Sequence, residues 1–103
     1  VAAAAETGAE AVELNTDRYS HLWRKQGSAV RVLDELSRAA QAAARSGLVV
    51  NVGHGLDYRN VVPILEARLA RGFSIGFAIV ARAVFVGLRD AVAEMKRILE
   101  VYS

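Results

Sequence analysis

The chain has 103 residues, 53% of them hydrophobic, and its 13 Lys and Arg against 11 Asp and Glu give a formal net charge of +2. This length allows one small domain at most, since about 150 residues is the usual size of a domain. Cys is absent, so the chain has no disulfide, thiolate nucleophile or cysteine metal site. We expect a cytoplasmic protein.

The charged and apolar residues also argue against two classes of partner. Basic residues are spread along the chain and form no block of like charge, so we expect no nucleic-acid partner. No uninterrupted apolar run approaches the roughly 20 residues of a membrane span. We therefore expect no membrane partner either.

The first eight residues contain four consecutive alanines and end at Gly8. They resemble the tail of a helix that this glycine ends. The start of the chain lacks a Met, a basic segment and a helix cap, so it does not read as a signal peptide. We interpret the chain as a fragment, a processed product or an engineered piece.

Residues 11–15 predict the first strand, because apolar and polar side chains alternate there with the period of a strand that has two different faces. Val12 and Leu14 should face helices. Glu13 and Asn15 should face the opposite side of the sheet, which is the interior in a parallel barrel. Glu13 is expected to be a paired structural carboxylate rather than a catalytic one.

A polar stretch and a helix are predicted next. Residues 16–27 show no clean period and predict a long polar loop. Ser28 is an acceptable N-cap, and from Val30 the apolar residues keep near-helical spacing until Ser46-Gly47. This pattern predicts a helix.

Residues 48–52 predict the second strand, which is continuously apolar apart from Asn51, as expected of a strand buried on both faces. Gly53-His54-Gly55 then breaks it. Asn60 can cap the following helix, because Pro63 would fall in the first turn, where a missing N–H costs nothing.

A third strand is predicted at about residues 73–77, followed by a short helix over 78–86. Gly87 separates this helix from a final one, whose apolar stripe has helical spacing and should be core or a subunit contact. The stripe comprises Leu88, Val92, Met95, Leu99 and Tyr102.

Strands that alternate with helices indicate an α/β fold with a parallel sheet. Three strands do not close a barrel, which needs eight, and open sheet edges must be paired or covered. We expect residues 1–103 to form one partial-barrel unit, completed by a second copy or by a complementary chain.

Two loops that follow predicted strands carry the candidate site. His54 is a titratable group at the end of an apolar strand, a position suited to acid/base chemistry, although a loop histidine with a hydrogen-bonding role is the alternative. Gly76 precedes a short helix whose free N–H groups would attract an anion, or it merely relieves crowding. Phe77 is more simply explained by packing. We find no metal-ligand spacing and expect no cofactor.

Three segments together resemble the C-terminal part of the pyridoxine 5′-phosphate synthase family. They are Val-Asn-Val-Gly-His-Gly-Leu-Asp-Tyr-Arg-Asn-Val at 50–61, Ser-Ile-Gly-Phe-Ala-Ile at 74–79, and Val-Gly-Leu-Arg-Asp-Ala-Val-Ala-Glu-Met-Lys at 86–96. The resemblance implies the last three βα units of a (β/α)8 barrel. It also implies condensation of 1-deoxy-D-xylulose 5-phosphate with 3-amino-2-oxopropyl phosphate.

By this resemblance His54 would be the proton donor, while Gly55 and the Gly76-Phe77 pair would hold the substrate phosphate. The other acid/base residues of the family come from earlier strands. The family usually has Gly-His where this chain has Gly76-Phe77, and His-Thr-Gly where it has Asn15-Thr16-Asp17. An Asp near a phosphate would repel it unless the side chain points away, so these departures predict an altered site.

Three hypotheses follow. The chain is part of a pyridoxine 5′-phosphate synthase barrel that needs its missing strands for catalysis; it is a truncated or engineered barrel fragment that self-associates without catalysis; or it is a residual module that binds inorganic phosphate through Gly55 and the amides after Gly76.

Overall fold

The computed structural model describes residue 8 and residues 10–102 and arranges them as an α/β fold with a three-stranded parallel sheet. The predicted helix tail at residues 1–7 lies outside the described residues. In chain order the elements are β1 (Ala11–Asn15), α2 (Asp17–Gln26), α3 (Val30–Arg45), β2 (Val49–Gly53), α4 (Val61–Glu66), β3 (Gly72–Ser74), α5 (Phe77–Val86) and α6 (Leu88–Tyr102).

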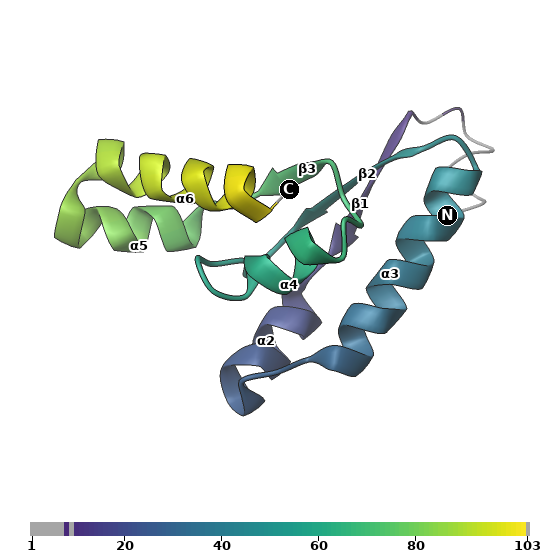
Figure 1. The fold of residues 1–103 in the computed structure, drawn as a ribbon, viewed down its shortest axis with the longest axis horizontal. Coiled ribbons are helices and arrows are strands. Elements are labelled where there is room, and N and C mark those ends of the chain that lie inside the picture. The colour runs from purple at the N-terminus through teal and green to yellow at the C-terminus, as the bar shows by residue number, and fades with distance from the viewer. Residues whose placement is uncertain (1–7, 9, 103) are drawn as a thin grey trace.

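The strands lie side by side in chain order, β1-β2-β3, and both pairings are parallel. The predicted α/β class and parallel sheet are therefore confirmed. Parallel neighbours require crossover connections, which α2 and α3 supply between β1 and β2 and α4 supplies between β2 and β3. Figure 1 shows that the α5–α6 hairpin extends from the opposite side of the molecule to α3.

The hydrophobic core lies on one face of the sheet. Val50 and Val52 of β2 are buried there, together with side chains of α3, α4 and α6. Val12 and Leu14 of β1 pack against the same core, whereas Glu13 and Asn15 are exposed. The predicted two-faced strand is thus confirmed.

The prediction that the second strand is buried on both faces is wrong. Val49 is 40% exposed, and Asn51 is only half-buried. Within the described chain no helix covers the face that carries these side chains and Glu13. This sheet face is consequently open.

The predicted loop over residues 16–27 is wrong, because most of it forms helix α2. Tyr19, Leu22 and Trp23 are spaced three and four positions apart and point into the core, with Tyr19 almost fully buried. Gly27, at φ +71°, ends the helix, and its N–H donates to the Trp23 carbonyl. Charged residues between the aromatic ones hid this apolar face in the sequence.

The third strand is shorter than predicted. It ends at Ser74, and Phe77 is the first residue of α5 rather than the last of the strand. The short helix predicted over 78–86 is confirmed to within one residue, and Gly87 separates it from α6 as expected. The turn at Gly76 redirects the chain, with the Val80 N–H bonded to the Gly76 carbonyl.

Two helix starts differ from the prediction in detail. Ala29, not Ser28, precedes the first residue of α3. Asn60 does precede α4, but its side chain makes no capping bond to that helix. Its carboxamide instead accepts the Asp57 N–H and donates to the Gly55 carbonyl, so Asn60 stabilises the preceding loop.

The predicted apolar stripe on the last helix is buried only in its centre. Met95 is buried and Leu99 packs on the core, while Leu88, Val92 and Tyr102 are exposed. In the part of the chain that the structure describes, no helix has both the length and the apolar character needed to cross a bilayer.

Candidate functional site

Two loops at the carboxyl edge of the sheet form one open hollow of about 700 Å³. The first follows β2 and contains His54 and Gly55; the second follows β3 and contains Gly76 and Phe77. Since β2 and β3 are parallel neighbours, their carboxyl ends lie at the same edge of the sheet. All four residues that the sequence pointed to line this hollow, and their roles stay predictions.

The His54-Gly55 loop has a backbone conformation that few residues adopt. His54 has φ +98° and Gly55 has φ +73°. A positive φ is uncommon outside glycine, so the loop needs support at His54. Gly55 is required for space as well, because a Cβ there would lie 2.7 Å from the Cβ of Ser20.

That support comes from α2 and the residue before it. The Thr16 hydroxyl donates to the His54 carbonyl at 2.8 Å, and the Ser20 hydroxyl donates to the same oxygen at 3.2 Å. Both hydroxyl residues are buried. The backbone of His54 is therefore held from beneath, while its imidazole remains exposed toward the hollow.

The Gly55 carbonyl is held in a similar way. Arg24 Nη2 donates to it at 2.9 Å and Asn60 Nδ2 at 3.2 Å. The hydroxyl of Tyr19 donates to the Asn60 carbonyl at 2.6 Å. Helix α2 thus contacts the loop through hydroxyl, guanidinium and phenol groups.

The N–H groups of Gly55 and Gly76 have no role in holding the described part of the fold. No acceptor within the described residues takes the N–H of Gly55 or of Gly76, and α5 begins without a side-chain cap. Unpaired amides at the start of a helix attract anions. Both glycines line the hollow, so their unpaired amides are candidate hydrogen-bond donors to an anion bound there.

The sheet supplies the floor of the hollow through Glu13. Gly53 lies beside it, and a Cβ on Gly53 would come within 2.5 Å of Glu13 Oε1 and 2.9 Å of the Ser74 Cβ. Glycine at this position lets the Glu13 side chain lie across β2. Among the described residues Glu13 is exposed and makes no ion pair, so its expected pairing inside a closed barrel stays a prediction.

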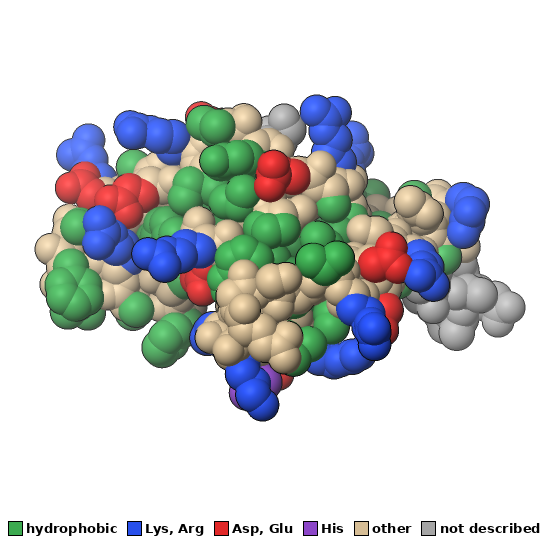
Figure 2. All heavy atoms as spheres, turned by 60° about the horizontal axis from the view of Figure 1, so that its bottom comes forward, with side chains coloured by type: hydrophobic (Ala, Val, Ile, Leu, Met, Phe, Trp, Pro, Cys, Tyr) green, Lys and Arg blue, Asp and Glu red, His purple; other side chains and the backbone are tan. Residues whose placement is uncertain are grey.

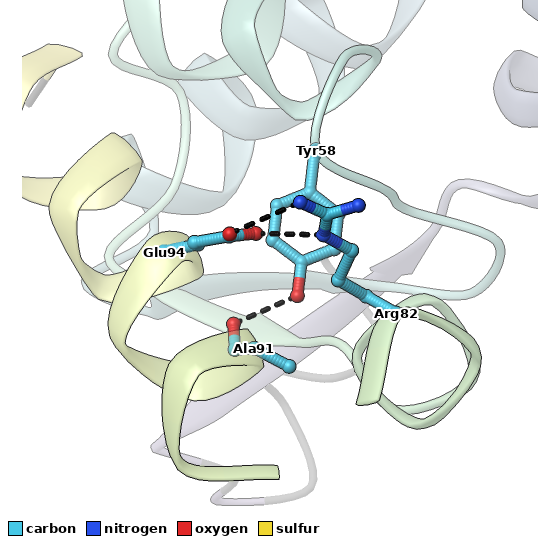
Figure 3. Close-up of polar contacts among 4 residues, drawn as sticks. All are labelled: Tyr58, Arg82, Ala91 and Glu94. Carbon is cyan, nitrogen blue, oxygen red and sulfur yellow. Dashed lines mark hydrogen bonds and ion pairs between the residues drawn. The ribbon is translucent and has the colours of Figure 1, made fainter. Parts of the chain in front are cut away.

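A polar cluster away from the hollow links the first loop to helices α5 and α6. The Tyr58 hydroxyl donates to the Ala91 carbonyl of α6 at 2.7 Å, and Arg82 of α5 bonds both carboxylate oxygens of Glu94. Figure 3 shows the Tyr58 ring beside this pair. Tyr58 is three residues after Gly55, so the cluster ties the first loop to the hairpin that begins at Phe77.

The electrostatics of this cluster follow from its contacts. The hydrogen bond from Arg82 lowers the pKa of the Glu94 carboxyl, and burial raises the pKa of the Tyr58 hydroxyl. A carboxyl with a lowered pKa stabilises the fold at neutral pH, and this contribution is lost as the pH falls through that pKa. The tie between loop and hairpin is accordingly strongest when Glu94 is ionised.

The residues that depart from the family pattern lie in different places. Asn15 Oδ1 accepts the N–H of Asp17 at 2.8 Å, and neither side chain lines the hollow. Phe77 lines the hollow, yet its side chain is 85% exposed. Only the Phe77 departure therefore lies at the candidate phosphate position.

Comparison with known proteins identifies the family. The family model described as "Pyridoxal phosphate biosynthesis protein PdxJ" matches residues 1–101. The chain belongs to the PdxJ family. The resemblance that the sequence motifs suggested is thereby confirmed.

Several curated members of the PdxJ family are similar to this chain, and each is named pyridoxine 5′-phosphate synthase. The Azoarcus sp. (strain BH72) protein is 43% identical over 94% of this chain and 41% of its own length. The Aromatoleum aromaticum protein is 43% identical over 96% and 42%, and the Magnetococcus marinus protein 44% identical over 96% and 40%. The chain spans about two fifths of the length of these relatives.

Sequence reasoning missed the residues that hold the His54-Gly55 loop in place, which are Thr16, Ser20, Arg24 and Asn60. Three of them lie on or beside α2, which was predicted as a loop. The i, i+4 spacing of Thr16, Ser20 and Arg24 was the available signal, since it puts them on one side of a helix. Among the described residues no group of three His, Cys, Asp or Glu side chains could hold a metal ion.

The Tyr19 hydroxyl provides a test of how α2 supports the loop. Burial, with a smaller contribution from Asp57, raises the pKa of Tyr19 to about 12. The stabilisation by a protonated Tyr19 is complete below pH 10, the ordinary pKa, and is lost as the pH rises toward 12. At pH 7 Tyr19→Phe should cost about 1 kcal/mol for the lost hydrogen bond.

We expect the difference in free energy of unfolding between wild type and Tyr19→Phe to shrink between pH 10 and 12. Urea unfolding followed by circular dichroism at several pH values measures it. Tyr102→Phe is the matched control, because Tyr102 lies at the exposed end of α6. A constant difference across this pH range would contradict the assignment of the buried, protonated Tyr19 hydroxyl.

Proposed function

We propose that this chain forms one side of the active site of a pyridoxine 5′-phosphate synthase. The observation that carries the proposal is that His54-Gly55 and Gly76-Phe77, on loops after neighbouring parallel strands, line one hollow. Family membership and the names of the relatives support it. The proposed setting is the cytoplasm.

In this proposal residues 1–103 are one partial-barrel unit, the last three βα units of a (β/α)8 barrel. The open sheet face, with Glu13, Asn15 and Val49, would be the barrel interior. The remaining strands would come from further polypeptide, either a complementary chain or another copy. The coverage of about two fifths of each relative supports this view.

The chemistry proposed is the condensation of 1-deoxy-D-xylulose 5-phosphate with 3-amino-2-oxopropyl phosphate, with release of phosphate and water. His54 would donate a proton, for which its exposed imidazole beside the hollow is suitably placed. The amides of Gly55, Gly76 and Phe77 would hold the substrate phosphate. The missing acid/base groups would come from earlier strands, so we expect no turnover from residues 1–103 alone.

A complementation assay tests the catalytic proposal. The chain is mixed with the complementary N-terminal part of a family member, and formation of pyridoxine 5′-phosphate is measured. His54→Ala should lower the rate by roughly 10²-fold or more, the effect of removing a general acid. His21→Ala is the matched control, because His21 is exposed on α2 and does not line the hollow.

Activity that is indifferent to His54→Ala would refute the role of His54. A stable complex of the two parts without ring closure would refute the proposed reaction. Circular dichroism of each variant shows whether the substitution has disturbed the fold.

A second candidate is a self-associating structural module without catalysis, and the exposed apolar side chains of α5 and α6 favour it. Val80, Val84 and Phe85 are 62%, 80% and 83% exposed. Figure 2 shows hydrophobic side chains at the surface toward the end of the molecule that holds the α5–α6 hairpin. Exposed apolar patches of this kind commonly mark contact sites.

Sedimentation at micromolar concentration tests the second candidate. Self-association should produce a dimer or larger species, and Phe85→Asp should shift the chain toward monomer because the charge would be buried in the contact. Val30→Asp serves as control, since Val30 is equally apolar and 73% exposed but lies on α3. A well-folded wild-type monomer would rule this module out.

A further inference from the structure

The lining of the hollow contains more acidic than basic side chains. Glu13 and Asp57 contribute two carboxylates to its lining, whereas Arg24 is the one Lys or Arg that lines it within the described chain. A phosphate group would be repelled by the carboxylates. Phosphate binding here therefore depends on how each charge is directed.

The Asp57 carboxylate is used within its own turn. Its Oδ1 accepts the N–H groups of Arg59 and Asn60, both at 2.8 Å. The Glu13 carboxylate extends from β1 over Gly53 on the sheet floor. Glu13 thus approaches the hollow from β1, and Asp57 approaches it from the turn that precedes α4.

Arg24 reaches the hollow from α2. One of its guanidinium nitrogens donates to the Gly55 carbonyl at 2.9 Å, which places the charged group beside Gly55. A guanidinium has five N–H donors, and no other acceptor in the described part of the chain takes those that remain. A planar guanidinium binds phosphate oxygens in pairs.

We propose that Arg24 is the cation that binds the phosphate of the substrate in this hollow, together with the amide N–H of Gly55 and those at the start of α5. The ligand class is a phosphate monoester dianion. This inference rests on the proposed function, because it names a further binding residue for the same site. Because Arg24 bonds to the Gly55 carbonyl, its guanidinium and the Gly55 N–H would bind the same phosphate group.

Calorimetric titration of the protein with inorganic phosphate tests the role of Arg24. Arg24→Gln should weaken binding about tenfold or more, as expected for loss of a charge-assisted contact. Lys25→Gln, which removes the same charge one residue away and outside the hollow, should leave the affinity unchanged. Glu13→Gln should strengthen binding, because it removes a repelling carboxylate.

Arg24→Lys separates the charge from the loop contact. It should retain part of the affinity, and the affinity of wild type should fall with rising salt more steeply than that of Arg24→Gln. If Arg24→Gln does not fold, the folded Arg24→Lys variant decides. The inference is overturned if this variant binds phosphate with the full wild-type affinity and if that affinity does not change with salt concentration.

The two proposals fail in different ways. Wild-type binding that Arg24→Gln leaves unchanged overturns the role of Arg24 and leaves the proposed phosphate site intact. Absence of any wild-type binding at millimolar phosphate overturns the phosphate site itself, and with it this inference.

Discussion

The hydrogen bonds from the Thr16 and Ser20 hydroxyls to the His54 carbonyl are the contacts on which the candidate site depends. His54 has a positive φ, which costs a non-glycine residue free energy unless its surroundings hold it. Buried hydroxyls supply that support, and an unpaired carbonyl in their place would carry a desolvation cost. The imidazole is then free to face the hollow because the backbone alone is held.

The same helix places the remaining groups around the loop. Arg24 and Tyr19 lie on α2 and reach the Gly55 carbonyl and the Asn60 carbonyl. On the other side, Tyr58 connects the loop to the α5–α6 hairpin through Ala91. The loop after β2 is thus fixed at both ends, which sets its position relative to Gly76 and Phe77.

The open sheet face is consistent with the proposal that this chain forms one side of a larger site. Glu13, Asn15 and Val49 point away from the core, and Gly53 makes room for Glu13 rather than for core packing. This arrangement agrees with the proposal that further strands close the barrel over the face. The exposed apolar side chains of α5 would find cover in the same assembly or in a second copy.

Strong periodicity is what made part of the fold predictable from the sequence. The first strand, the long helix α3 and the parallel order follow from the alternation at residues 11–15 and the helical spacing from Val30. His54 and Gly76 were recognisable because they follow apolar strands. Helix α2 was missed because three core side chains stand among charged ones, and its contacts, such as the Tyr19 hydrogen bond to the Asn60 carbonyl, join positions far apart in the sequence.

Other differences arise because the sequence does not show which neighbours cover a segment. The apolar run at 48–52 indicates burial on both faces, which would require a layer that the described chain lacks. Asn60 is a residue type that often caps helices, yet its carboxamide bonds to Asp57 and Gly55 rather than to the amides of α4. The role of Arg24 depends on a contact between α2 and a loop 31 residues away.

We propose that the loops after β2 and β3 form a single anion site. Phosphate titration followed through the amide ¹H and ¹⁵N shifts of Gly55 and Gly76 is the sharpest test of this proposal. Both amides should shift together and saturate with one dissociation constant. Shifts at only one of them, two unrelated dissociation constants, or no shift at either would contradict it.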